Sequence, residues 1–300
     1  MPQALLIFDR AWLRARQRRA MTLGPATFLL DHVARDFGDR LASVLRHFEC
    51  AVDLGTPGDQ VRSAMAASGK IGTLIAAKPL TGVLPSHAAL TIAADEEVLP
   101  FRDASLDLVV SGLALHTVND LPGTLVQIRR ALKPDGLFLA ALLGGDTLTE
   151  LRQAFADAET EIEGGVSPRV APFSDLRDLG ALLQRAGFAL PVTDVERLTV
   201  RYPSVISLLH DLRRMGATNG LTERRRLPLK RKTLGRMAEI YTRRFSDADG
   251  RLRATFEIIW LSGWSPHESQ QKPLAPGSAK KRLADALGTI EFGTGEKAGR

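Results

Sequence analysis

The residue types best suited to bind a small ligand lie directly after short apolar runs in the first half of the chain. They combine carboxylates, which accept hydrogen bonds from hydroxyl and amino groups, with glycines, which let a ligand approach the backbone. These candidate residues are Asp53, Gly55, Gly58, Asp95, Glu96, Ser111 and His116. Each one alone is also compatible with a plain turn residue or an ordinary loop acid, so only a shared location would make them a binding site.

The apolar runs themselves are typical of buried strands in a parallel sheet. Between residues 50 and 143 they alternate with longer amphipathic segments, which predicts an α/β fold with helices on both faces of the sheet. The predicted strands are 51–54, 71–76, 89–94, 106–111 and 136–143. Ligands bind at the carboxyl ends of the strands in such sheets, so we expect the candidate residues to form one rim.

A second polar group follows the fifth predicted strand and points to substrate contact. Asp146 is expected to cap a helix over 147–163, and Glu150 and Arg152 lie in its first two turns. We predict that these three side chains contact the substrate, with a capped and solvated helix end as the alternative. The following segment, 164–173, is rich in glycine and proline and is interpreted as a loop that covers the cleft.

The last third of the chain predicts two more strands, 195–202 and 254–260, separated by helices over 205–215 and 233–245. This order predicts a helical insertion at about 203–246. Its basic residues are Arg224, Arg225, Arg226, Lys230, Arg231, Lys232 and Arg236. They are interpreted either as a partner-recognition element or as a solvated face.

Composition excludes several classes of protein. The 300 residues have a net charge of +6, 44% hydrophobic side chains and one cysteine, Cys50, which excludes a disulfide framework and favours a reducing compartment. No apolar stretch is long enough to cross a bilayer, so a cytoplasmic location is expected. The chain lacks the Gly-x-Ser-x-Gly pattern of hydrolases and the full glycine pattern of nicotinamide-binding proteins. Nucleic acid is not an expected partner, because no stacking platform of aromatic residues accompanies the basic clusters.

The N-terminal segment, 1–47, is predicted to be helical and begins with a basic amphipathic helix. Among its arginines, apolar residues recur at spacings of about three to five, namely Ile7, Phe8, Trp12 and Leu13. The arginines are Arg10, Arg14, Arg16, Arg18 and Arg19. Packing on its own domain, contact with an acidic partner and peripheral association with an anionic inner-membrane surface remain as alternatives.

Several longer motifs resemble class I methyltransferases that use S-adenosylmethionine, in the branch of the carboxyl methyltransferases of biotin synthesis. These are Ala94-Asp95-Glu96-Glu97-Val98-Leu99-Pro100-Phe101, Leu115-His116-Thr117-Val118-Asn119-Asp120-Leu121-Pro122 and Leu132-Lys133-Pro134-Asp135-Gly136. A closer likeness covers almost the whole chain through Phe8-Asp9-Arg10, Gly144-Gly145-Asp146-Thr147-Leu148 and Gly263-Trp264 with His267-Glu268-Ser269-Gln270. This combination resembles the respiratory complex I assembly factor 5 family of methyltransferase-like proteins.

The resemblance implies a Rossmann-like fold with a seven-stranded, mostly parallel sheet and a cleft for S-adenosylmethionine. For mitochondrial relatives it also implies hydroxylation of an arginine in a complex I subunit, which makes such a subunit the expected partner. The residues themselves show no hydroxylase chemistry, because iron-dependent oxygen activation calls for two histidines and a carboxylate on one metal. The six histidines form no His-x-Asp or His-x-Glu doublet, so no metal site is expected and the catalytic residues stay unknown.

The loop after the first strand departs from the methyltransferase pattern. An acid followed by Gly-x-Gly-x-Gly is typical there, whereas this chain has Pro57 and Asp59 at the second and third glycine positions. Proline removes an N–H donor, and Asp59 adds a carboxylate near the position of the cofactor's own carboxylate. The acid expected after the second strand is also missing, since Lys78 stands there. These departures predict weak or lost S-adenosylmethionine binding.

Three functions therefore remain open. The first is a methyltransferase-fold protein of the complex I assembly type, which acts on or binds a protein subunit. The others are an active methyltransferase and a noncatalytic assembly scaffold. The predicted organisation is a helical segment at 1–47, a methyltransferase-like domain at 48–264 and a flexible tail at 265–300.

Overall fold

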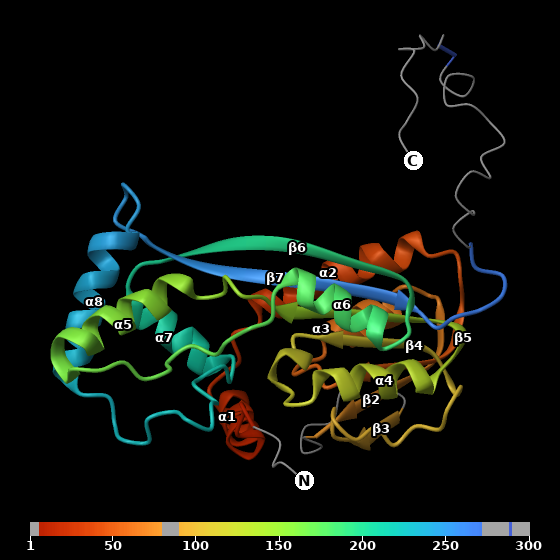
Figure 1. Cartoon of the computed structure of the whole chain (residues 1–300), viewed down its shortest axis with the longest axis horizontal. Coiled ribbons are helices and arrows are strands. Elements are labelled where there is room, and N and C mark those ends of the chain that lie inside the picture. The colour runs from red at the N-terminus through yellow and green to blue at the C-terminus, as the bar shows by residue number, and fades with distance from the viewer. Residues whose placement is uncertain (1–5, 80–89, 272–287, 290–300) are drawn as a thin grey trace, which may run out of the picture. The chain divides into compact units, whose positions relative to one another are not determined.

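A seven-stranded sheet forms the centre of the protein (Figure 1). The computed structural model describes residues 6–79, 90–271 and 288–289. The strands are β1 (Phe48–Leu54), β2 (Ile71–Lys78), β3 (Leu90–Ala93), β4 (Leu106–Gly112), β5 (Leu132–Leu143), β6 (Ala189–Tyr202) and β7 (Leu252–Trp264). Their order is β3-β2-β1-β4-β5-β7-β6; β1 to β5 are parallel, and β7 runs antiparallel to both of its neighbours. The predicted fold class is confirmed.

Helices cover both faces of the sheet because its strands are apolar on both sides. On one face, α2 (Phe28–Ser43) and α3 (Gln60–Ala67) bury Phe37 and Met65 against the strands. On the other face, α4 (Leu121–Ala131) and α6 (Leu176–Arg185) bury Ile128 and Leu183. The result is a three-layer arrangement with all five parallel strands ending at one rim.

A second, smaller core lies where β6 and β7 extend beyond the parallel strands. Helices α5 (Thr149–Glu163), α7 (Val205–Arg214) and α8 (Arg231–Phe245) pack there around Tyr241 and Phe256 (Figure 1). Helices α7 and α8 lie between β6 and β7 in the chain, within the predicted insertion.

Helix α1 (Arg10–Thr22) connects this smaller core to the rim of the sheet. Asp9 caps the helix by accepting a hydrogen bond from Trp12 N–H, and Leu13 is buried against Leu221. Asp9 N–H also donates to the carbonyl of Gly220 at 2.8 Å. The start of the chain is thereby attached to the loop between α7 and α8.

The compact unit extends to Pro266 and includes both α1 and α2. Most of the predicted flexible tail lies outside the described residues, so its flexibility stays a prediction. Within the described ranges, no helix combines the length and apolar character needed to cross a membrane.

Candidate functional site

The acid at the end of β1 forms a buried ion pair. Asp53 is 1% exposed and accepts hydrogen bonds from the hydroxyl of Thr56 and from Nη1 of Arg62. Arg62, on α3, has no exposed surface. Burial raises the pKa of Asp53 to about 6, although the positive charge of Arg62 opposes the shift. This carboxylate is held by the fold itself.

Arg62 also neutralises the extra acid of the loop. Its Nη2 donates to the carboxylate of Asp59 and to the carbonyl of Gly58. The repulsion expected from Asp59 toward an anionic ligand is therefore partly offset inside the protein. The three-residue spacing of Asp59 and Arg62 at the start of a helix was the sequence signal for this pair.

Glu96 lies directly over the glycine that follows β1. Gly55 has a φ of +74°, and a Cβ atom placed on it would lie 2.7 Å from Oε1 of Glu96 and 3.1 Å from Cβ of Ala114. Glu96 is only 6% exposed, and burial raises its pKa while the charge of Arg10 lowers it. The structure therefore brings the loops after β1, β3 and β4 together at one rim, with Glu96 filling the space above Gly55.

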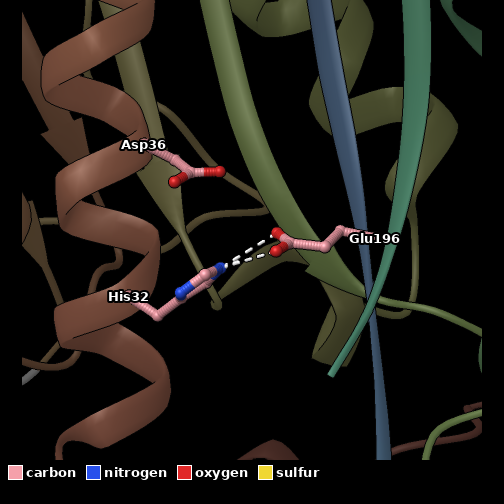
Figure 2. Close-up of side chains that lie close together, drawn as sticks. All are labelled: His32, Asp36 and Glu196. Atoms are coloured by element: carbon pink, nitrogen blue, oxygen red, sulfur yellow. Dashed lines mark hydrogen bonds and ion pairs between the residues drawn. The ribbon is translucent and has the colours of Figure 1, made fainter. Parts of the chain in front are cut away.

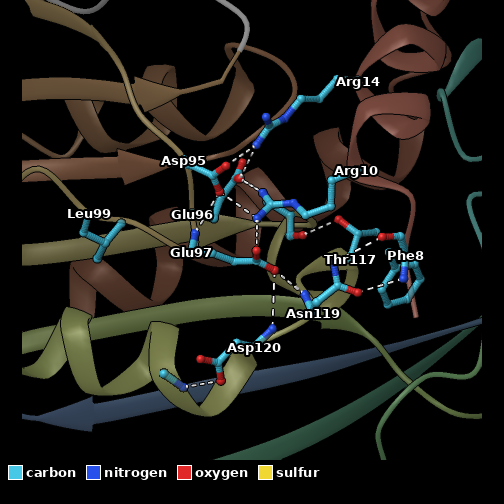
Figure 3. A network of polar contacts seen from close by, with 12 residues as sticks. Phe8, Arg10, Arg14, Asp95, Glu96, Glu97, Leu99, Thr117, Asn119 and Asp120 are labelled. Atoms are coloured by element: carbon cyan, nitrogen blue, oxygen red, sulfur yellow. Dashed lines mark hydrogen bonds and ion pairs between the residues drawn. The ribbon is translucent and has the colours of Figure 1, made fainter. Parts of the chain in front are cut away.

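Two arginines of α1 bind the acids of this rim, as Figure 3 shows. Nη1 of Arg10 lies 2.6 Å from Oδ1 of Asp95 and 3.0 Å from Oε2 of Glu97, while Nη2 pairs with Glu96. Arg14 donates to Oδ2 of Asp95 at 2.7 Å. Burial tends to raise the pKa of Asp95, but the N–H of Glu97 and both arginines together lower it. The first helix of the chain thus covers the carboxylates after β3.

Asn119 ties the same rim to the residues before α1. Its N–H donates to Glu97, and its Oδ1 accepts from the N–H of Phe8 at 2.8 Å (Figure 3). Phe8 and Asn119 are 111 residues apart in the sequence. Because local patterns carry no information at this distance, the contact could not be predicted from the sequence.

Ser111 and His116 occupy different environments. The hydroxyl of Ser111 donates to the carbonyl of Leu54 at 2.7 Å and has no exposed surface, so it links β4 to β1. His116 packs edge-on against Phe173 with 5.7 Å between ring centroids, and its Nδ1 has no hydrogen-bond partner in the described part of the chain. Burial lowers the pKa of His116 to about 4, which keeps the ring neutral at pH 7. Phe173 ends the loop that was predicted to cover the cleft.

The predicted substrate residues do not act as one group. Glu150 is buried and accepts from the N–H and hydroxyl of Thr255, and Arg152 donates to the carbonyls of Gly145, Thr147 and Ala171. Both side chains hold backbone in place. The prediction that Asp146 caps the next helix is wrong, because α5 begins after Leu148, which has a φ of +55° and no side-chain cap.

Asp146 instead belongs to an ion-pair group that sequence analysis missed. It lies 2.5 Å from Nη2 of Arg197, whose Nε lies 2.9 Å from the buried Glu257. Arg197 is on β6 and Glu257 is opposite it on β7, so only the strand register brings them together.

The basic residues of the insertion are largely paired within the protein. Arg224 binds Asp9 at 2.9 Å, and Lys230 binds Glu163 at 2.6 Å. Arg236 lies 2.6 Å from Glu161. Much of this charge therefore holds α8 and the preceding loop against α1 and α5.

The strand order and the helix layers define the class I methyltransferase fold. A family model described as a methyltransferase domain matches residues 52–140. The YcgJ protein of Bacillus subtilis shares the fold, with a TM-score of 0.54 and 15% identity over 79% of this chain and 99% of that one.

Sequence relatives define the family more closely. Arginine-hydroxylase NDUFAF5, mitochondrial, of Danio rerio is 38% identical over 94% of this chain and 90% of its own length. The chain belongs to the NDUFAF5 family. Malonyl-[acyl-carrier protein] O-methyltransferase of Laribacter hongkongensis is 40% identical over 69% of this chain and 64% of its own length.

The rim does not fit S-adenosylmethionine in its present arrangement. The glycine at residue 55 leaves room beside the backbone, but Glu96 fills that room. Arg10 and Arg14 engage the carboxylates that the sequence predicted to contact the cofactor, and β2 ends with Lys78 in place of an acid.

Proposed function

We propose that this protein acts on or binds a protein subunit during assembly of respiratory complex I and that it binds S-adenosylmethionine weakly. Family membership supports the role, since relatives over almost the whole chain carry the name arginine-hydroxylase. In this proposal the partner is a complex I subunit that presents an arginine. Peripheral contact with the inner membrane through α1 is part of the proposal.

The proposal that S-adenosylmethionine binds weakly rests on one observation. Glu96 lies over Gly55 and is held there by Arg10. A bound adenosyl group would have to displace this buried ion pair and then satisfy Glu96 in its place. A lost charged hydrogen bond weakens binding by about 1.5–3 kcal/mol, which corresponds to roughly tenfold to 150-fold. Two hydrogen bonds to the cofactor are lost in this way, one because Glu96 is paired with Arg10 and one because Lys78 replaces an acid. Together these losses move a micromolar Kd toward the millimolar range.

Calorimetric titration of the full chain with S-adenosylmethionine and S-adenosylhomocysteine tests this proposal. We expect small heats of binding, without saturation, for both S-adenosylmethionine and S-adenosylhomocysteine. A Kd in the low micromolar range for either one would contradict the proposal.

The protein partner is tested separately by capture from solubilised respiratory membranes, with the full chain as bait. We expect complex I subunits among the retained proteins, and mass spectrometry of their arginine-containing peptides then identifies the modification. A gain of one oxygen atom supports hydroxylation, whereas a gain of one methyl group identifies an active methyltransferase. Retention of a subunit without modification supports a scaffold. The absence of every complex I subunit would contradict the proposed partner.

The active methyltransferase remains as a second candidate because Gly55 keeps the left-handed conformation of a nucleoside-binding loop. The sequence likeness to malonyl-[acyl-carrier protein] O-methyltransferase also favours it. Transfer of a labelled methyl group from S-adenosylmethionine to a captured subunit would support this alternative over the first.

A further inference from the structure

Three side chains able to bind a metal converge outside the cleft. His32 and Asp36 lie one turn apart on α2, and Glu196 reaches toward them from β6 (Figure 2). One ligand atom from each residue lies within 4.8 Å of the other two. Nε2 of His32 is 2.9 Å from both carboxylate oxygens of Glu196.

Rigid elements hold these side chains in place. The neighbouring α2 residues Val33 and Phe37 have no exposed surface, and Phe37 packs edge-on against Trp260 of β7. Trp260 pairs with Asp194 of β6, two residues before Glu196. The helix and the edge strand are thus fixed to the same part of the sheet, which orients all three ligands from packed backbone.

The charges of the group are not balanced within the protein. Two carboxylates face one imidazole, and no ion pair or hydrogen bond of Asp36 is found in the part of the chain that the structure describes. Arg40 lies one turn beyond Asp36 on α2. Arg40 is already engaged, since it binds Asp194 at 3.1 Å and stacks over Trp260. A cation between the three ligands would relieve the repulsion between the two acids.

We propose that His32, Asp36 and Glu196 form a binding site for a first-row divalent transition metal. An imidazole nitrogen with two carboxylate oxygens suits Zn²⁺ and Mn²⁺, whereas Ca²⁺ and Mg²⁺ prefer oxygen ligands alone. Ligand atoms around one such ion lie about 2.0–2.2 Å from it, and hence roughly 4 Å or less from one another. Small rotations of half-buried side chains close the observed spacing to this range.

The site differs from an iron centre for oxygen activation, because it has one histidine rather than two. It lies between α2 and β6, and none of its residues is in the rim formed by the loops after β1, β3 and β4. We therefore assign it the role of joining α2 to the edge strand, and the assignment does not depend on the proposed function.

Metal titration of the full chain tests the site. After treatment with a chelator, the protein is titrated with Zn²⁺ by calorimetry and with Co²⁺ by visible absorption, which reports imidazole and carboxylate coordination. We expect one equivalent to bind and to raise the melting temperature. Asp36→Asn and Glu196→Gln should each weaken binding by at least about tenfold, and His32→Asn should also alter the Co²⁺ spectrum.

The matched control is Asp39→Asn, which removes an exposed carboxylate from the same helix and should leave the affinity unchanged. Melting of each variant without metal shows that it is folded. Failure of the wild-type chain to bind either ion would overturn the proposal. Equal affinity in wild type and in the triple variant would overturn it too, since the ion would then bind elsewhere. Preference for Mg²⁺ over Zn²⁺ would rule out the proposed class of metal.

Discussion

Two groups of acids at the cleft are both paired with arginine, but in different ways. Asp53 is paired with Arg62, nine residues away and without exposed surface, so the pair belongs to the interior of the fold. Asp95 and Glu96 are paired with Arg10 and Arg14 from a helix more than 80 residues away in sequence. The side chain of Asp95 is 37% exposed. The first pair is part of the folded core, whereas the second is a contact that helix movement could open.

This difference matters for ligand binding because we expect only the second group to change without unfolding of the protein. Separating a buried ion pair leaves an uncompensated charge in a low-dielectric interior. Moving α1 away from the rim would instead expose Asp95, Glu96 and both arginines to water, which solvates their charges. We expect mutations of the first group to change the free energy of unfolding and mutations of the second to change ligand affinity.

The largest expected effect follows from Arg62→Met. Without Arg62, Asp53 must either hold an unpaired buried charge or take up a proton, and either cost should lower the free energy of unfolding at pH 7 by up to about 3–5 kcal/mol. Urea denaturation of the variant and the wild-type chain measures the change. The double variant Asp53→Asn/Arg62→Met should recover much of the loss, because no buried charge remains. A loss below about 1 kcal/mol for Arg62→Met would show that the first group does not belong to the core.

The pH dependence of stability should also separate the two groups. Burial raises the folded-state pKa of Asp53 from 3.8 to about 6, so the folded protein takes up this proton at a higher pH than the unfolded chain does. The resulting stabilisation is complete below pH 3.8 and disappears as the pH rises through 6, a change of about 3 kcal/mol for a shift of this size.

Urea denaturation between about pH 2.5 and 7 measures this effect as a difference between the wild-type chain and Asp53→Asn. As the pH falls through 6, the wild type should gain stability relative to the variant. Asp95 should behave oppositely, because its pKa is lowered and its contribution is lost as the pH falls below the ordinary range of an aspartate. If the free energy of unfolding changes with pH in the same way in Asp53→Asn and Asp95→Asn, the predicted difference between the two groups is wrong.

A smaller effect is expected from opening the rim. In Arg10→Gln/Arg14→Gln the acids of the rim lose their cationic partners, so Asp95 and Glu96 become free to accept hydrogen bonds from an adenosyl group. We expect the affinity for S-adenosylhomocysteine to rise by roughly tenfold, about 1.4 kcal/mol. Calorimetry measures the gain, and Arg18→Gln on the exposed side of α1 is the control. Unchanged or weaker binding in the double variant would mean that α1 does not close the site.

The sequence predicted the fold well because apolar runs and helix spacing are local signals. All seven strands were placed, although β6 begins at Ala189 rather than 195, since the first part of this edge strand is mostly exposed and lacks a clear pattern. The meeting of the loops after β1, β3 and β4 also followed from parallel topology. The roles of Arg10 and Arg14 could not be derived from spacing, because they depend on how α1 packs on loops more than 80 residues away. The group around Glu196 was missed for the same reason, since its partners come from distant elements.

The smallest expected effect concerns the loop that departs from the methyltransferase pattern. The carboxylate of Asp59 is paired with Arg62, so its charge is already partly offset before any ligand binds. Asp59→Asn should therefore change the affinity for S-adenosylhomocysteine by less than about threefold, even though the sequence pattern alone predicts a clear gain. Pro57→Gly restores an N–H donor and should give the larger improvement of the two. Calorimetry of both variants in the Arg10→Gln/Arg14→Gln background compares them with the rim open. If Asp59→Asn tightens binding more than Pro57→Gly does, Arg62 does not offset the charge of Asp59, and repulsion at the glycine loop limits binding more than the missing N–H of residue 57 does.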